Sequence, residues 1–130
     1  MPQGTRPVRY RTRKMVMPAD LNGRNTLFGG KLVSWIDEEA YIYAVCQLET
    51  LNIATVYIGD FQFHSPASNG DIIEIGVEAT RFGTTSLEMK AEARNKTTKQ
   101  LISSCSKIVV VTLDAAGIKT PHGKTQIKDD

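Results

Sequence analysis

The sequence predicts a single α+β domain in which an antiparallel sheet curls around one long helix. Three observations carry this prediction. Residues 31–48 are apolar over most of a helical circumference, five other segments have the composition of β-strands, and the last four of these are joined by short polar turns. Consecutive strands with short turns form antiparallel sheets, and one helix cannot supply the crossovers of a parallel sheet.

The expected strands follow from local composition. Arg9, Arg11 and Arg13 recur at every second position with less polar residues between them, which is strand periodicity and puts the three arginines on one face. Turns are expected where Pro, Asn, Gly and Ser gather. Periodicity is lost from Asp114 onward, which indicates a flexible tail. The expected elements are strands at residues 8–17, 53–64, 72–82, 86–94 and 101–113, a loop at 18–30, the helix at 31–48, a domain at 1–113 and a tail at 114–130.

The long helix is unusual because its apolar side chains cover most of its circumference, so the sheet should bury it on most sides. Asp37, Glu38 and Glu39 lie two turns into this helix, too far from its start to compensate the helix dipole. An unpaired carboxylate is too costly to bury. These acids therefore either form structural ion pairs or serve a functional pocket, and the helix alone leaves both interpretations open.

The loop before the helix ends in Phe28-Gly29-Gly30. Glycines let a ligand approach the backbone closely, and the first N–H groups of a helix have no partner within it. Such N–H groups stabilise an oxyanion, although close packing of the loop on the helix explains a glycine pair equally well. Asp37 follows Gly30 by seven residues, about 10 Å along a helix axis. A substrate group and a water fit that gap, which favours Asp37 as a functional acid.

Overall composition argues against several classes of protein. A formal net charge of +2 in 130 residues weakens a nucleic-acid role. No apolar run is long enough to span a bilayer, and the Arg-rich residues 1–14 contain no secretory signal. A mitochondrial presequence is an alternative for that stretch, but its strand periodicity favours a place in the fold. Cys46 and Cys105 match no metal-binding spacing and are expected to be buried thiols. We expect a cytoplasmic protein.

Residues 17–40, MPADLNGRNTLFGGKLVSWIDEEA, resemble the hotdog-fold acyl-CoA thioesterases, in the YciA-like branch of cytosolic acyl-CoA hydrolases. The family pattern has Pro-x-Asp-x-Asn, a short loop, a large residue before Gly-Gly, and an acid seven residues after the second glycine. Asn25 departs from it, at a position that is often glycine. The matching residues are Asp20, Asn22, Phe28, Gly29, Gly30 and Asp37, followed by Phe63, Pro66, Gly70-Asp71 and Arg81 to Ser86, so the resemblance covers about residues 8–113.

The resemblance implies a fold, a reaction and a site. A five-stranded antiparallel sheet would wrap a long central helix, and two subunits would join in one sheet with the active site at their interface. The reaction would be hydrolysis of acyl-CoA to a free fatty acid and coenzyme A, which makes coenzyme A part of the substrate and leaves no cofactor. Asp37 of one subunit and Asn22 of the other would be catalytic, and the N–H group of Gly30 would bind the thioester oxygen. Candidate substrate-binding residues are Phe28, Gly29, Thr55, Arg81, Gly83, Thr84 and Ser86.

The same resemblance implies a homodimer assembled into a tetramer or hexamer, without a nucleic-acid or membrane partner. Asp37 would act as general base on a water, or attack directly through an anhydride, and the sequence does not separate these routes. Thr55 would hydrogen-bond the water. No metal ligand set is visible.

Three other functions stay open. A dehydratase or hydratase of the same fold would place a histidine beside the acid, and neither the helix nor its preceding loop contains one. A non-catalytic acyl-CoA-binding protein would use the same pocket without turnover. Nucleic-acid binding would use the arginine strand, whose simpler role is a charged edge that discourages aggregation.

His64 and His122 are expected to be structural or inert, and the absence of Gly-x-Ser-x-Gly argues against a serine hydrolase.

Overall fold

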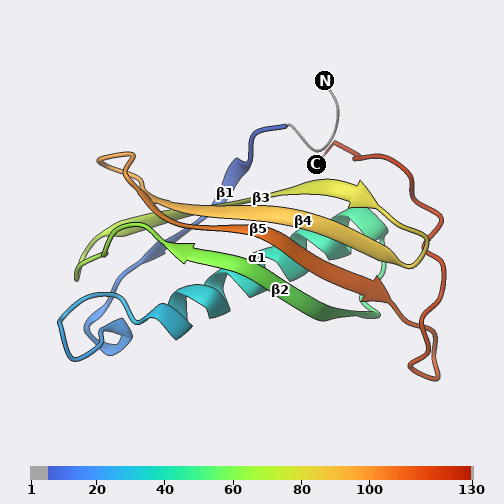
Figure 1. The fold of residues 1–130 in the computed structure, drawn as a ribbon, viewed down its shortest axis with the longest axis horizontal. Helices are drawn as coiled ribbons and strands as arrows, with labels where there is room; N and C mark the ends of the chain where they lie inside the picture. The colour runs from blue at the N-terminus through green and yellow to red at the C-terminus, as the bar shows by residue number, and fades with distance from the viewer. Residues whose placement is uncertain (1–5, 130) are drawn as a thin grey trace.

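A computed structural model describes residues 6–129 and contains one long helix beside a five-stranded sheet (Figure 1). The strands are all antiparallel, in the order β1-β3-β4-β5-β2, so the predicted fold class is confirmed. The helix begins two residues earlier than expected because the glycine pair forms its first turn. The elements are β1 (Arg9–Met15), the 3-10 helix η2 (Pro18–Asp20), α1 (Gly29–Leu48), β2 (Ile53–Phe63), β3 (Ile72–Phe82), β4 (Ser86–Asn95) and β5 (Leu101–Thr112).

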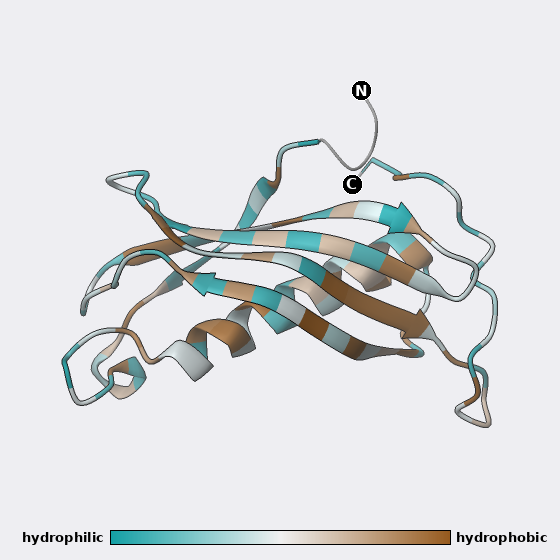
Figure 2. Ribbon diagram, in the orientation of Figure 1, coloured by the Kyte–Doolittle hydropathy of each residue, from teal (hydrophilic) through white to brown (hydrophobic). Residues whose placement is uncertain are grey.

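The core lies between α1 and one face of the sheet. Along β4, buried Leu87, Met89 and Ala91 alternate with half-buried polar residues, which is the predicted strand periodicity. Ile36 and Ala40 of α1 are fully buried against this face. The apolar C-terminal half of β5 adds to the same layer (Figure 2). Burial of this continuous apolar layer holds the helix on the sheet.

The helix is not enclosed on most sides, contrary to expectation. Ile42 is 52% exposed, and Cys46 is exposed rather than buried, whereas Cys105 is buried as predicted. The sheet of a single chain covers one side of α1, and Ile42 and Cys46 lie on another. Tyr43 and Glu39 join them around a small hollow of about 130 Å³.

The arginines of β1 do not share a face, and that prediction is wrong. A β-bulge shifts the register of β1 on β3 between Tyr10 and Thr12, and the extra residue reverses the alternation. The guanidinium of Arg11 consequently lies 5.2 Å from the ring centre of Tyr43, on the helix side. Arg13 instead approaches Glu74, with 3.7 Å between Nε and the nearer carboxylate oxygen.

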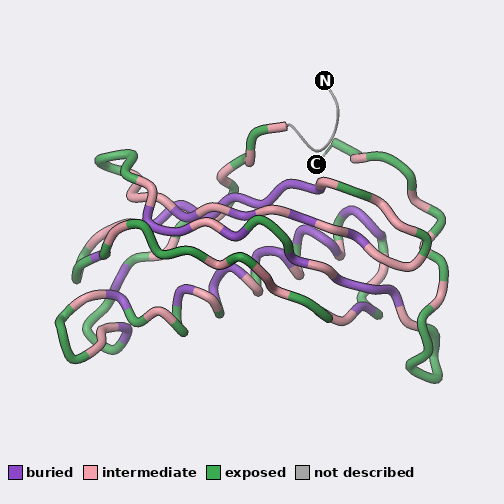
Figure 3. The backbone as a smooth tube through the Cα atoms, in the orientation of Figure 1, coloured by how far each residue is buried: buried purple, intermediate pink, exposed green. Residues whose placement is uncertain are grey.

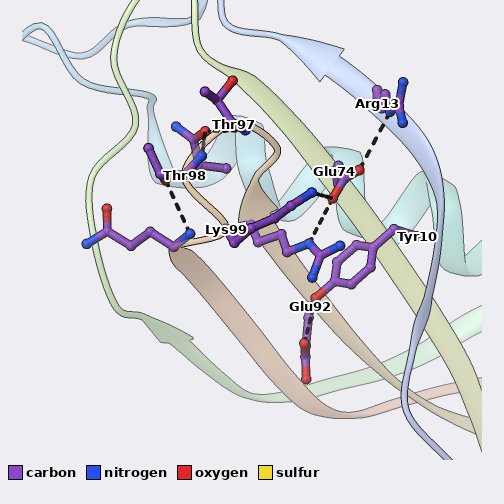
Figure 4. Close-up of polar contacts among 10 residues, drawn as sticks. Tyr10, Arg13, Glu74, Glu92, Thr97, Thr98 and Lys99 are labelled. Atoms are coloured by element: carbon purple, nitrogen blue, oxygen red, sulfur yellow. Dashed lines mark hydrogen bonds and ion pairs between the residues drawn. The ribbon is translucent and has the colours of Figure 1, made fainter.

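The outer face of the sheet carries an ionic cluster that fastens β1 (Figure 4). Arg94 Nε donates to Glu74 at 2.8 Å, and Lys99 lies 4.0 Å from the same carboxylate. The hydrogen bond from Arg94 holds the pKa of Glu74 below its usual range. The Tyr10 hydroxyl donates to Glu92 at 2.7 Å, and the Arg94 guanidinium stacks 3.9 Å from the Tyr10 ring centre. The charges around β1 therefore have structural partners.

Residues 114–129 contain no helix or strand, yet hydrogen bonds attach them to the domain. Leaving β5, the segment passes the sheet end near the C-terminus of α1 (Figure 1). The backbone N–H of Thr120 donates to Thr112 at 2.9 Å. Gln47 of α1 exchanges two hydrogen bonds of 2.9 Å with the backbone of Lys128. Flexibility of this tail stays a prediction, but its path is defined by these contacts.

Within residues 6–129, no helix combines the length and the hydrophobicity that crossing a membrane requires.

Candidate active site

Asp37 is half-buried in the third turn of α1 and faces β2. The hydroxyl of Thr55, near the start of β2, donates to Asp37 Oδ1 at 3.0 Å. No other described residue donates to Asp37, so its second carboxylate oxygen is left for a ligand or water. The predicted hydrogen bond from a water to Thr55 stays a prediction, and the Thr55 hydroxyl keeps its acceptor lone pairs for it. A hydroxyl that orients one oxygen of a carboxylate fixes the direction of the other.

The other two acids of the triplet have different surroundings. Glu38 is exposed and forms an ion pair with Lys14 at 3.2 Å. Glu39 is buried and accepts a hydrogen bond of 2.8 Å from the Thr12 hydroxyl of β1. Burial raises the pKa of Glu39, and the Thr12 hydrogen bond partly opposes this. Structural pairing therefore describes Glu38 and Glu39, and Asp37 is the acid that faces β2.

The start of α1 leaves backbone donors without partners. The carbonyl of Phe28 accepts from the N–H groups of Lys31 and Leu32, at 3.0 and 3.2 Å. The N–H groups of Gly29 and Gly30 make no hydrogen bond within the described part of the chain, and the Phe28 side chain does not cap them. Such donors at a helix start attract negative charge.

The two glycines differ in what surrounds them. A Cβ added at Gly29 would lie 3.2 Å from the Phe63 ring, so this glycine permits close packing of α1 on the end of β2. A Cβ added at Gly30 would make only an ordinary contact, 3.5 Å from the Phe28 ring. Packing therefore explains the small residue at Gly29. It does not explain Gly30, whose role in ligand binding stays a prediction.

Asn22 organises the loop before the helix. Its side-chain oxygen accepts from the backbone N–H groups of Arg24 and Thr26, at 2.9 and 3.2 Å, and its amide nitrogen donates to the Thr26 hydroxyl at 3.1 Å. One amide N–H of Asn22 remains for a ligand. Asn25 has a φ of 60°, in the left-handed region that asparagine tolerates and glycine prefers. This explains why asparagine can replace the usual glycine here.

Two pockets flank the start of the helix. Asn22 and Gly29 line one of about 410 Å³, together with Leu32, Phe63 and Ile102. Phe28 and Gly30 line another of about 370 Å³. Asp37 lines neither pocket, and the hydrogen bonds of the Asn22 side chain join it to Arg24 and Thr26 of its own loop.

The turn between β3 and β4 carries the remaining predicted residues. Arg81, Gly83 and Thr84 line a cleft of about 380 Å³, whose opposite wall is the tail at residues 121–125. Arg81 Nη1 donates to Glu88 at 2.8 Å, and the Ser86 carbonyl accepts from His122 Nε2 at 2.9 Å. His122 was expected to be inert and its docking was missed, because neither periodicity nor spacing marks the tail. His64 bonds to Ser104 at 2.8 Å.

Among residues 6–129, no group of three or more His, Cys, Asp or Glu side chains is placed to hold a metal ion.

A helix seated on a five-stranded antiparallel sheet, with an acid two turns past a glycine pair, defines the class of hotdog-fold proteins. The family model described as the thioesterase superfamily matches residues 24–102. The chain belongs to this superfamily.

Its relatives include acyl-CoA hydrolases. The uncharacterized acyl-CoA thioester hydrolase YkhA of Bacillus subtilis is 33% identical over 111 residues, which are 82% of this chain and 63% of the relative. The chain spans about three fifths of the length of the curated relatives it matches.

Solved structures agree with this placement. An apo-hexameric acyl-CoA thioesterase superposes with a TM-score of 0.77 and 30% identity, over 85% of this chain and 72% of that one. The acyl-CoA hydrolase of Staphylococcus aureus, solved in complex with butyryl coenzyme A and coenzyme A, gives a TM-score of 0.79 and 28% identity, over 92% and 71% of the two chains.

Proposed function

We propose that the protein is an acyl-CoA thioester hydrolase in which Asp37 is the catalytic carboxylate. The observation that carries this proposal is the hydrogen bond of 3.0 Å from Thr55 to a half-buried Asp37, two turns beyond a helix start with unpartnered N–H groups. The acyl-CoA hydrolases among the relatives support the choice of substrate. The proposal includes a cytoplasmic location and a reaction without a cofactor.

The chemistry follows from these groups. A water oxygen attacks the thioester carbonyl carbon while Asp37 accepts a proton from that water. The carbonyl oxygen becomes an oxyanion, which the helix-start N–H groups stabilise. The carbon–sulfur bond then breaks, and the coenzyme A thiolate takes up a proton. In the alternative route, Asp37 attacks the carbonyl itself, and water hydrolyses the resulting anhydride.

The proposed site needs two subunits. Strand β2 is an edge of the sheet, and much of it is exposed (Figure 3). Its exposed apolar residues are Val56, Tyr57 and Phe63. An exposed apolar edge strand is suited to pairing with another chain. Antiparallel pairing of β2 with its copy, about a two-fold axis near its middle, would oppose Thr55 of one subunit with Phe63 of the other.

This pairing would complete the site. Phe63 lines the same pocket as Asn22 and Gly29, whereas Thr55 is bonded to Asp37. Pairing β2 with its copy therefore brings Asn22 and the helix start of one subunit to Asp37 of the other. The hexamer among the similar structures supports further assembly of such dimers.

A thiol-release assay over a series of acyl-CoA chain lengths tests the activity. We expect turnover by the parent protein and a large loss for Asp37→Ala with folding intact. Binding of acyl-CoA by the parent protein without thiol release would instead favour a non-catalytic carrier.

Co-expression of two inactive variants tests the shared site. In a mixed dimer of Asp37→Ala and Asn22→Ala subunits, one of the two sites keeps both side chains. Random pairing would therefore restore roughly a quarter of the parent activity. No recovery would place both residues in a site formed within one chain.

A further inference from the structure

The cleft at the β3–β4 turn has a second wall. Arg81, Phe82, Gly83 and Thr84 form one side, and residues 121–125 of the tail form the other, around a volume of about 380 Å³. The tail segment has no secondary structure of its own. Its position must therefore be fixed by side-chain and backbone contacts with the turn.

His122 supplies those contacts. Its backbone N–H donates to the Thr84 carbonyl at 3.2 Å, and its Nε2 lies 2.9 Å from the Ser86 carbonyl. Its Nδ1 accepts from the backbone N–H of Lys124 at 2.9 Å. A carbonyl can only accept and a backbone N–H can only donate, so the ring is neutral with its proton on Nε2. The ring also meets Phe82 edge-on at 6.2 Å between centroids.

Lys124 brings a positive charge to this wall. Its Nζ lies 3.6 Å from Glu49 at the end of α1, and Lys128 shares the same carboxylate at 3.2 Å. Hydrogen bonding from Lys128 and the charge of Lys124 hold the pKa of Glu49 below its usual range. Of these three residues Lys124 lines the cleft, and it shares its carboxylate partner with Lys128.

Arg81, on the opposite wall, likewise shares its carboxylate partner with a lysine. Glu88 pairs with Arg81 at 2.8 Å and with Lys107 at 3.4 Å. The charged residues that line the cleft are therefore Arg81 and Lys124, one on each wall, and no carboxylate is among the lining residues. An anion that enters such a cleft gains favourable interactions with both walls.

We propose that Lys124, held in place by His122, binds the phosphate-bearing end of coenzyme A from the tail side of this cleft. This inference rests on the proposed function. It assigns a binding role to the tail and makes the tail a determinant of selectivity for nucleotide-bearing thioesters. Lysine acts here as a point charge, so its effect should depend on charge more than on shape.

The test compares two thioesters with the same acyl group, acyl-CoA and the corresponding acyl-pantetheine, which lacks the nucleotide. For Lys124→Gln we expect KM for acyl-CoA to rise roughly fivefold, with kcat unchanged and KM for acyl-pantetheine unchanged. Lys124→Arg should restore KM for acyl-CoA. A rise in KM that is equal for both thioesters, or no rise, would overturn the inference.

Two control variants separate charge from structure. Glu49→Gln breaks the same ion pair but leaves the Lys124 cation in place, so KM for acyl-CoA should stay unchanged or fall. An increase matching that of Lys124→Gln would mean that the ion pair merely holds the tail, which contradicts the proposal. Lys119→Gln removes an exposed charge of the tail outside the cleft and should have no effect.

Calorimetric titration with free coenzyme A and with pantetheine makes the test independent of turnover. If Lys124→Gln binds coenzyme A more weakly than the parent but binds pantetheine equally well, the cleft assignment is supported. Failure of the parent to hydrolyse either thioester would refute only the proposed hydrolase activity. Equal affinity of the parent and Lys124→Gln for coenzyme A would refute the cleft assignment while leaving hydrolysis intact.

Discussion

The two edges of the sheet each hold a carboxylate of α1 through a threonine, and yet they differ in character. At the β1 edge, Thr12 donates to Glu39, which is 6% exposed. At the β2 edge, Thr55 donates to the half-buried Asp37. The β1 edge is short and rich in arginine, whereas β2 is 11 residues long and much of its backbone path is exposed (Figure 3). The exposed residues of β2 include large apolar ones. A charged edge discourages a further strand, and an apolar one accepts it.

This difference teaches that a hydrogen-bonded carboxylate is not in itself a site. Glu39 has a good partner, but it is closed in by β1 and α1, and burial raises its pKa. Asp37 has a comparable partner on β2, an edge strand with exposed apolar residues. The contrast predicts kinetic effects on the β2 side and stability effects on the β1 side.

Removing the acid on the β2 side should have the largest effect. We expect Asp37→Asn to lower kcat by roughly 10²- to 10⁴-fold, the usual contribution of a general base. The melting temperature and circular dichroism should stay close to the parent values. Glu38→Gln, an exposed acid of the same helix, serves as the matched control and should keep full turnover. Normal turnover by Asp37→Asn would remove the functional distinction between the edges.

Tyr43→Phe should destabilise the other side of the helix. The Tyr43 hydroxyl donates to Glu78 at 2.9 Å and accepts from the Ala79 N–H at 3.0 Å. The second oxygen of Glu78 is already buried without a partner. Losing the hydroxyl should cost about 1–3 kcal/mol in the free energy of unfolding, measured by urea titration, with kcat retained.

The control for this variant is Tyr41→Phe. The Tyr41 hydroxyl bonds to the carbonyls of exposed Leu51 and of Ile53 and is not fully buried, so its loss should change stability less. Equal losses for the two variants would argue against a special cost at Glu78.

Thr55→Val should lower kcat about tenfold, because a hydrogen bond to a charged group contributes roughly 1.5 kcal/mol. KM should change little, since the hydroxyl orients the acid rather than the substrate. The paired control is Thr12→Val at the β1 edge, which removes the equivalent bond to Glu39. If Thr55→Val and Thr12→Val lowered kcat equally, the hydrogen bond to Asp37 would have no catalytic role beyond that of the structural bond to Glu39.

Glu39→Gln should have the smallest effect, and one that depends on pH. Because the folded-state pKa of Glu39 is raised, the folded chain binds this proton more tightly than the unfolded chain. The stability that this proton contributes is complete below the ordinary value of 4.5 and is lost as pH rises through the folded pKa.

Thermal melts of Glu39→Gln and the parent should therefore agree near pH 4. At pH 7 the variant should melt roughly 2–4 °C higher, because a neutral amide replaces a buried charge. A constant difference at both pH values would contradict the raised pKa.

Much of the fold could be predicted because its signals are local. The strands at residues 72–82 and 86–94 follow from alternation and turn residues, and the structure ends them within one residue of the prediction. The bulge in β1 could not be predicted, since one extra residue leaves no mark in composition and reverses every side chain after it. The exposure of Cys46 depends on how far the sheet curls, which no local pattern records.

For the candidate site, the roles of the predicted residues stay predictions. Motif spacing indicates Asp37, Asn22 and the glycine pair, and the structure gives Asp37 its partner at Thr55. Spacing along the chain did not indicate that the tail returns to the β3–β4 turn. His122 and Lys124 lie 36 or more residues from the nearest parts of that turn, so only tertiary structure joins them to Arg81.

The pair of hydrogen bonds between the Gln47 side chain and the backbone of Lys128 has a practical consequence. Gln47 lies ten residues beyond Asp37 on α1, about 15 Å along the helix axis. A fluorophore attached next to Lys128 would sit within energy-transfer range of an acceptor-labelled substrate without touching the acid. Such a reporter would register docking and release of the chain end in real time, even in a subunit whose chemistry has been disabled.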